Sequence, residues 1–117
     1  MAENNSNFMS GVPELLVLRL VREKEMYGYE LVQAIRERSN EAIALGEGVI
    51  YPVLHALERD GALSSSRKTV NGRSRVYYTL TATGVRRLDD LAGNWSRLTE
   101  AIQAVLGGPA IGGVSHA

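Results

Sequence analysis

The dipeptide Asn71-Gly72 lies at the centre of a segment, Ala62 to Leu80, in which apolar and polar residues alternate. Both residues accept positive φ angles, and together they are the strongest short signal for a two-residue β-hairpin turn. Such a turn also fixes the strand register, because the side-chain period is two. The sequence thus excludes a purely helical fold and predicts five cross-strand pairs: Val70 with Arg73, Lys68 with Arg75, Arg67 with Val76, Ser65 with Tyr78 and Leu63 with Leu80.

This register gives the hairpin one apolar face and one polar face. The face that we expect to be buried carries Leu63, Val76, Tyr78 and Leu80. The face that we expect to be exposed to solvent carries Lys68, Arg73, Arg75, Tyr77 and Thr79. Because the two sets separate without a misfit, the alternation supports the register.

Helical patterns flank the hairpin on both sides. Ser10 and Pro13 suit the start of a helix, Gly61 suits a C-terminal cap, and Thr81 can cap a helix after the hairpin. The fold class is therefore mainly α with a small β-hairpin. The predicted helices are about Gly11 to Glu25, Tyr29 to Ser39, Gly48 to Gly61 and Ala82 to Leu106, with a connector from Glu41 to Glu47.

The predicted last helix carries an apolar residue every three or four positions, which is the spacing of a heptad seam. About 25 residues form a rod of ~37 Å, longer than the preceding domain can cover. An apolar seam left in water would be an exposed patch, so we expect it to pair with a second copy of the chain in a homodimer. The predicted dimer interface consists of Leu88, Leu91, Trp95, Leu98, Ile102 and Val105.

Composition excludes several classes of protein. The chain of 117 residues contains no cysteine, which rules out a disulfide scaffold and a thiolate metal cluster. Its longest apolar run, Leu15 to Leu18, is far shorter than the roughly 20 residues of a membrane span, and the polar N-terminus is not a signal peptide. Because histidine occurs only at positions 55 and 116, no catalytic set or metal site can be assembled. We expect a cytoplasmic protein that is not an enzyme and has no cofactor.

Charge is balanced over the whole chain, with 13 Lys and Arg against 13 Asp and Glu, but it is unevenly distributed. Gly61 to Leu88 contains no acid, and its six basic residues are Arg67, Lys68, Arg73, Arg75, Arg86 and Arg87. Like charges facing each other across strands, as predicted for Lys68 and Arg75, cost about 0.2–1 kcal/mol. A polyanion would reverse that cost, whereas the alternative is a solvated hairpin whose charges protect it from aggregation.

The order helix, helix, connector, helix and hairpin is that of a winged helix-turn-helix. In this arrangement the third helix enters the major groove of DNA and the hairpin contacts flanking phosphates. Taken alone, His55 would be an ordinary exposed histidine, and Arg59 could pair with Asp60. The predicted DNA contacts are Tyr51, His55 and Arg59 on the third helix and Arg67, Lys68, Arg73 and Arg75 in the hairpin.

The chain divides into one domain, one long helix and two short ends. The ends are small, polar or rich in glycine, which is typical of mobile tails. We expect a disordered tail over residues 1–9, the winged helix-turn-helix domain over 10–80, the dimerisation helix over 81–106 and a flexible tail over 107–117.

Trp95 is too large for tidy coiled-coil packing in the seam. It is either a plain aromatic residue of the dimer core or one of two tryptophans that flank a gap for a flat aromatic ligand. Gly93, which costs about 1 kcal/mol in a helix interior relative to alanine, is consistent with room beside it. The predicted effector site consists of Trp95, Leu91 and Leu98.

Four segments together resemble the PadR family of bacterial transcriptional regulators: Tyr27 to Leu31, Gly48 to Leu54, Leu57 to Gly61, and Arg75 to Thr81 followed by Gly84. The single C-terminal helix is similar to the short subfamily, and Trp95-Ser96-Arg97 is similar to a segment of multidrug-binding members. The resemblance covers Val12 to Ile102. It implies a homodimeric repressor that binds a palindromic operator and is released by a small aromatic or hydrophobic effector. Val49 departs from the Ser or Thr common in the family, which removes a hydroxyl cap or phosphate contact.

Two other functions are compatible with the residues. A dimeric winged-helix protein-interaction module without DNA binding would suit the neutral net charge and the acidic first half of the chain. A small-molecule carrier would bind its ligand at Trp95 without any coupling to DNA. The regulator alone requires DNA affinity that falls steeply with salt.

Overall fold

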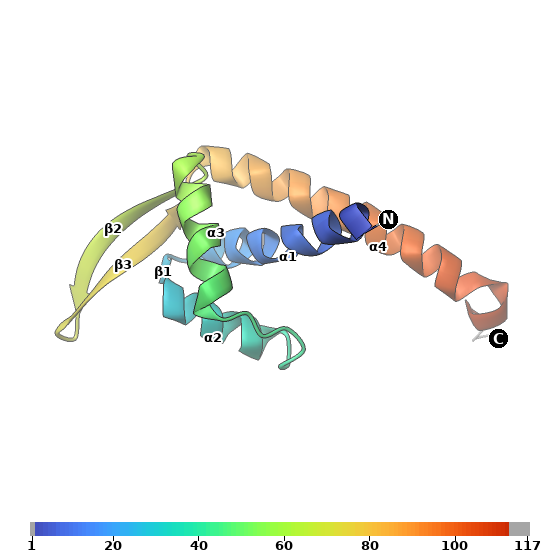
Figure 1. Ribbon diagram of the computed structural model, residues 1–117, viewed down its shortest axis with the longest axis horizontal. Coiled ribbons are helices and arrows are strands. Elements are labelled where there is room, and N and C mark those ends of the chain that lie inside the picture. Colours follow the sequence, from blue (N-terminus) through green and yellow to red (C-terminus); the bar gives the residue numbers. More distant parts are fainter. Residues whose placement is uncertain (1, 113–117) are drawn as a thin grey trace.

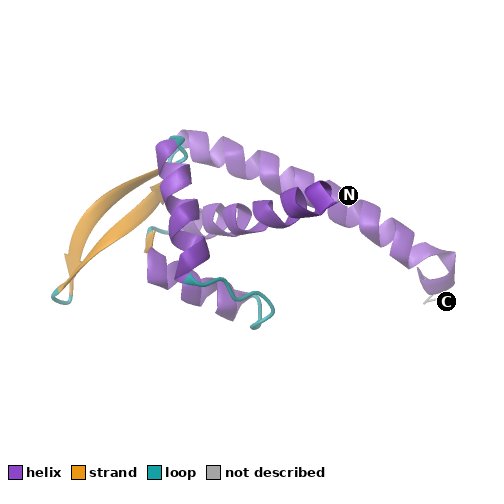
Figure 2. Cartoon of the chain, in the orientation of Figure 1, coloured by secondary structure: helices purple, strands orange, loops and turns teal. Residues whose placement is uncertain are grey.

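The computed structural model describes the backbone of residues 2–112 and the side chains of residues 11–107. Within these residues, helices and strands follow the predicted order, which confirms the fold class (Figures 1 and 2). The elements are α1 (Ala2–Glu23), β1 (Met26–Tyr27), α2 (Gly28–Arg38), α3 (Glu47–Arg59), β2 (Leu63–Val70), β3 (Arg73–Leu80) and α4 (Ala82–Gly112).

Helices α1, α2 and α3 form the body of the molecule, and the hairpin of β2 and β3, called the wing below, projects from one side of it (Figure 1). Helix α4 starts beside the end of α3, passes α1 and extends away from the wing. The molecule measures 57 × 27 × 26 Å along its principal axes. The wing and the far end of α4 therefore lie at opposite ends of an elongated shape.

The wing has the register predicted from its turn. Asn71 and Gly72 both adopt positive φ angles, 53° and 77°. All five predicted pairs are present, from Val70 with Arg73 at the turn to Leu63 with Leu80 at the base. The chemistry of the two-residue turn was therefore sufficient to predict which residues face each other.

A third strand, β1, corrects the predicted environment of Tyr77. The sheet has the order β1-β3-β2, and the added strand pairs Tyr27 with Tyr77. The two rings meet edge to face with their centroids 5.3 Å apart, and Tyr77 is only 9% exposed. The prediction that Tyr77 faces solvent was wrong, because the neighbouring strand covers it.

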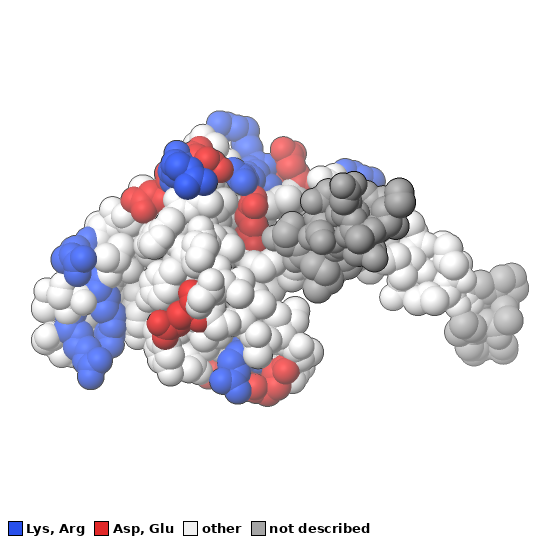
Figure 3. Space-filling model, viewed as in Figure 1, with Lys and Arg blue, Asp and Glu red and all other residues white. Residues whose placement is uncertain are grey.

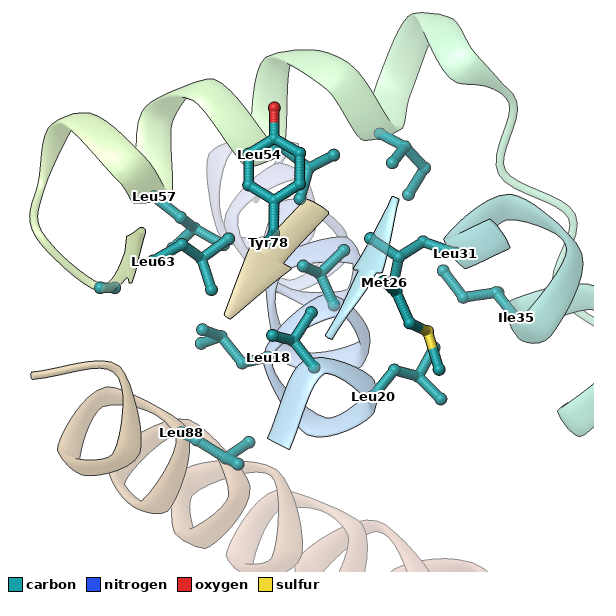
Figure 4. Packing of buried hydrophobic residues seen from close by; sticks show 14 of the residues in the cluster. Leu18, Leu20, Met26, Leu31, Ile35, Leu54, Leu57, Leu63, Tyr78 and Leu88 are labelled. Carbon is teal, nitrogen blue, oxygen red and sulfur yellow. The ribbon is translucent and has the colours of Figure 1, made fainter. Parts of the chain in front are cut away.

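One hydrophobic core joins the three body helices, the sheet and the start of α4 (Figure 4). Helix α3 contributes Ile50, Leu54 and Leu57, which are at most 1% exposed. Burying a side chain of this kind contributes about 1.5–3 kcal/mol, so this face of α3 is held firmly against the body. The opposite face, with His55 and Arg59, is left exposed.

The outer helices extend further than predicted. Helix α1 begins at Ala2 instead of Gly11 and ends at Glu23, and α4 continues beyond Leu106 to Gly112. Residues 2–9 and 107–112, predicted as tails, are therefore helical; Met1 and residues 113–117 lie outside the described residues. Asparagine and serine disfavour a helix by only a few tenths of a kcal/mol each, so polar composition alone does not stop one. Even with these bounds, no helix among the described residues is long and apolar enough to cross a membrane.

The first turn of α4 is fixed against the end of α3. Thr81 Oγ1 accepts a hydrogen bond from the backbone N–H of Gly84 at 3.0 Å, as expected of a helix cap, and donates to the carbonyl oxygen of Gly61 at 2.7 Å. A Cβ on Gly84 would lie 2.2 Å from the carbonyl oxygen of Ala62, so only glycine permits this close approach. The start of helix α4 thus packs directly against the domain that precedes it.

Leu88 does not belong to an exposed seam. It is 3% exposed and lies in the core of its own protomer (Figure 4), so it has no surface left for a partner chain. Leu91 is half-buried against the same core. The prediction of Leu88 as a dimer contact was therefore wrong, and the large apolar residues that α4 leaves exposed lie further along the helix: Trp95, Leu98, Ile102, Val105 and Leu106.

Candidate nucleic-acid interface

A groove of about 430 Å³ lies between the exposed face of α3, the start of α2 and the wing. Five of the seven predicted DNA contacts line it: Tyr51, His55, Arg67, Arg73 and Arg75. The fold therefore brings residues from two separate elements, α3 and the wing, to one surface. On the face that Figure 3 shows, basic side chains of the wing form a blue strip at the end of the molecule, with no acidic residue among them.

The three wing arginines of the groove are free of ion pairs with the carboxylates of the described residues. Arg67 Nη1 donates a hydrogen bond to Ser74 Oγ at 3.2 Å, and the Arg75 guanidinium lies 4.3 Å from the centroid of the Tyr27 ring. Neither contact neutralises the positive charge. Arg67, Arg73 and Arg75 can therefore give charge-assisted hydrogen bonds to an anion in the groove.

On the α3 side of the groove, Tyr51 lies against the first residue of α2. A Cβ on Gly28 would lie 2.4 Å from the Tyr51 ring, so the ring takes its position because residue 28 has no side chain. The Tyr51 and His55 ring centroids are 6.2 Å apart, one helical turn along α3. This turn of α3 offers a hydroxyl and an imidazole to a ligand in the groove.

Further lining residues were not predicted as part of a site: Tyr27, Gly28, Tyr29, Ser74, Val76 and Tyr78. Burial raises the pKa of the Tyr78 phenol above its ordinary value, and Glu58 and Tyr51 raise this pKa further. The Tyr78 hydroxyl therefore stays protonated at neutral pH. In the sequence, Tyr27-Gly28-Tyr29 belonged to a segment that resembles the PadR family but was not predicted as part of a site, because its place in the groove depends on the pairing of β1 with β3.

The remaining two predicted contacts do not line the groove. Arg59 is at the C-terminal end of α3, where its Nε is 3.9 Å from an Asp60 carboxylate oxygen. Lys68 forms an ion pair with Glu25, and its Nζ lies 5.1 Å from the centroid of the Tyr77 ring. Lys68 and Arg75 do face each other in the register, but each has a separate partner: the Glu25 carboxylate for Lys68 and the Tyr27 ring for Arg75.

A second hollow, of about 410 Å³, lies beside α4 and is lined almost entirely by apolar residues. Trp95 is 39% exposed and forms one wall. Of the three predicted effector residues, only Trp95 lines this hollow; Leu91 and Leu98 do not. The other lining residues belong to α1 and to the connector before α3: Val12, Pro13, Ala42, Ile43, Ala44 and Leu45.

The fold and the groove define the class of protein: a winged-helix domain with an arginine-lined groove beside its third helix, as in DNA-binding proteins. Residues 17–90 match the transcriptional regulator PadR-like family, and the chain belongs to this family of DNA-binding, non-enzymatic transcription factors.

Individual relatives cover most of the chain. A transcriptional regulator of Mycobacterium tuberculosis is 34% identical over 101 residues, which are 86% of this chain and 89% of that protein. Among solved structures, a Streptococcus mutans protein has a TM-score of 0.77 and 32% identity, covering 85% of this chain and 90% of its own. A PadR family transcription regulator from Clostridium difficile has a TM-score of 0.74 and 28% identity, covering 83% and 100%.

Proposed function

We propose that the chain is a homodimeric repressor that binds a palindromic operator in the cytoplasm and releases it when a small aromatic or hydrophobic effector binds. The observation that carries the proposal is the groove, in which Arg67, Arg73 and Arg75 lie opposite the exposed face of α3. A second chain, joined through the exposed apolar residues of α4, would supply the second reading head that a palindrome requires.

The two sides of the groove have different tasks in this proposal. The wing arginines bind phosphates and give most of the affinity, which is independent of sequence. Tyr51 and His55, on the exposed face of α3, contact base edges in the major groove and select the site. Arg59, at the far end of α3, lies outside the groove and is assigned no base contact.

Affinity for operator DNA is expected to fall steeply with salt. With about four to eight phosphate contacts per dimer, log affinity should decrease against log salt with a slope of roughly −4 to −7. The measurement is a gel shift of the DNA upstream of the chain's own gene, repeated over a salt series. A flat salt response, or no shift at low salt, contradicts the proposed function and favours a protein-interaction module.

The hollow beside Trp95 is the proposed effector site. Its apolar lining suits a flat, uncharged or weakly polar molecule, and its walls come from three elements: α1, α4 and the connector that leads into α3. A ligand there would therefore contact both the helix that joins the two chains and the segment that sets the start of the DNA-reading helix.

Planar aromatic compounds are expected to quench the fluorescence of Trp95, the single tryptophan of the chain. Because binding free energies are reciprocal, a compound that weakens DNA binding must itself bind less tightly to the DNA complex, by the same factor of about 5–150. Titrations with and without operator DNA measure both affinities, with a bulky non-planar apolar compound as the control. Equal affinity in the two states rules out induction by that compound.

A further inference from the structure

Lys68 differs from the three arginines of the wing in having a carboxylate partner. Its Nζ is paired with Glu25, a residue 43 positions earlier in the chain, in the short link between α1 and β1. Both side chains remain partly exposed, 41% for Lys68 and 36% for Glu25. The ammonium group also lies 5.1 Å from the centre of the Tyr77 ring. Lys68 is thus held by an acid and an aromatic face of its own protomer.

Glu25 is placed to do this by the third strand. It directly precedes Met26, which pairs with Tyr78, while Tyr27 pairs with Tyr77 on the next position along β3. Tyr27, Tyr77 and Lys68 lie on one face of the sheet in this register, and the Glu25 carboxylate reaches Lys68 on that face from the residue before β1. The segment Gly61 to Leu88, which contains the wing, has no acid of its own. Glu25 therefore brings a negative charge to the wing from outside it.

We propose that Glu25 acts as an internal substitute for a DNA phosphate, which withholds Lys68 from DNA and thereby limits the sequence-independent affinity of the wing. The inference rests on the proposed binding of DNA by the wing arginines. A phosphate that takes Lys68 must first displace the Glu25 carboxylate, whereas Arg67, Arg73 and Arg75 give up no carboxylate. While Lys68 stays paired with Glu25, it makes no phosphate contact. It therefore releases no counterion from the DNA and adds nothing to the salt dependence of binding.

Weaker binding to DNA of any sequence is an advantage for a regulator. Every genome offers a large excess of nonspecific sites, so occupancy of an operator depends on the ratio of specific to nonspecific affinity. Phosphate contacts raise both affinities, while base contacts raise only the specific one. By neutralising one wing cation, Glu25 leaves a larger share of the operator affinity to the base contacts on the α3 side of the groove.

The substitution Glu25→Gln tests this role, because glutamine keeps the size and hydrogen-bonding capacity of the side chain and removes its charge. Binding to a random-sequence duplex of about 30 base pairs is followed by fluorescence anisotropy over a salt series. One more phosphate contact per protomer, or two per dimer, makes the slope of log affinity against log salt steeper by about 1.8. A fourfold rise in salt then costs the dimer roughly 12-fold more affinity than in the unmodified chain.

The matched control is Glu41→Gln. Glu41 is likewise an exposed acid paired with one basic residue, Arg36 at 3.0 Å, but it lies in the connector outside the groove. This variant changes the net charge of the chain equally and is expected to keep the unmodified slope. An equal change of slope in both variants overturns the proposal, because the effect would then come from net charge.

A second replacement tests whether Lys68 is the released cation. In the Glu25→Gln background, Lys68→Met retains the long apolar stem over Tyr77 and removes the ammonium group. The slope is expected to return to that of the unmodified chain, and a slope that stays steep overturns the proposal. If the unmodified chain binds no duplex at low salt, the proposed function fails and this inference fails with it. If that chain binds DNA and Glu25→Gln leaves the slope unchanged, only the inference fails.

Discussion

Replacement of Ile102 by glutamate is expected to convert a dimer of this chain into monomers. Ile102 is 43% exposed on the part of α4 that extends beyond the body, between Leu98 and Val105 on the same stripe. Burying a carboxylate costs several kcal/mol, and a twofold interface contains each substitution twice. The dissociation constant of the dimer should therefore rise on the order of 10³-fold or more, as measured by analytical ultracentrifugation across a concentration series.

The same variant is expected to lose affinity for a palindromic operator. Two joined reading heads bind the second half-site as an intramolecular step, which raises affinity by about 10²–10⁴ over a single head. The matched control is Gln103→Glu, which adds the same charge at the adjacent exposed position and points away from the stripe. If Ile102→Glu remains dimeric at low concentration, the contact between protomers lies elsewhere on the chain.

Local sequence chemistry predicted the wing well because a hairpin with a two-residue turn is determined within a few residues. Asn71 and Gly72 supply the required positive φ angles, and every predicted cross-strand pair is present. The order of helices was predicted for a similar reason, since each helix shows its own apolar period and caps. Structural features that depend on one segment alone could thus be predicted from the sequence.

Features that depend on contacts between distant segments could not be predicted from the sequence. A heptad seam indicates that one stripe of α4 is buried, but not by what, and the first member, Leu88, is buried by its own protomer. Strand β1 has only two residues, too few for an alternating pattern, yet it buries Tyr77 and brings Glu25 to Lys68.

Most of the residues that meet at the candidate site were named from the sequence, but their arrangement was not predicted. Five of the seven expected DNA contacts line one groove, because the helix order and the wing register together determine which faces meet. The exceptions, Arg59 and Lys68, are the two whose charges are paired with nearby carboxylates. Glycine at position 28 sets the place of the Tyr51 ring, and this contact between two helices could not be predicted from either segment alone.

Removal of two wing arginines, in the double variant Arg67→Ala and Arg73→Ala, is expected to weaken binding to all DNA sequences. Each phosphate contact contributes about 0.9 to the salt slope, so four lost contacts per dimer make the slope less steep by roughly 3.6. At about 0.1 M salt this corresponds to a loss of affinity on the order of 10³-fold. Fluorescence anisotropy with operator and random duplexes over a salt series measures both quantities.

The double variant Arg86→Ala and Arg97→Ala is the matched control. It removes the same charge from two exposed arginines of α4 that do not line the groove and whose side chains donate hydrogen bonds to Thr83 and Asn94. Its salt slope should equal that of the unmodified chain. Equal losses in the two double variants would mean that net charge, and not the geometry of the groove, determines the affinity.

Substitutions on the α3 side of the same groove should act differently. Tyr51→Phe and His55→Ala remove donors that face base edges, and each lost base contact changes discrimination at particular base pairs by about 1–3 kcal/mol. These variants should reorder the affinities for a set of operator mutants and leave the salt slope unchanged. Substitutions of the wing arginines should lower all of those affinities together, because phosphates are the same at every site. A wing variant that reorders sites, or an α3 variant that only changes the slope, would reverse this division of tasks between the two sides of the groove.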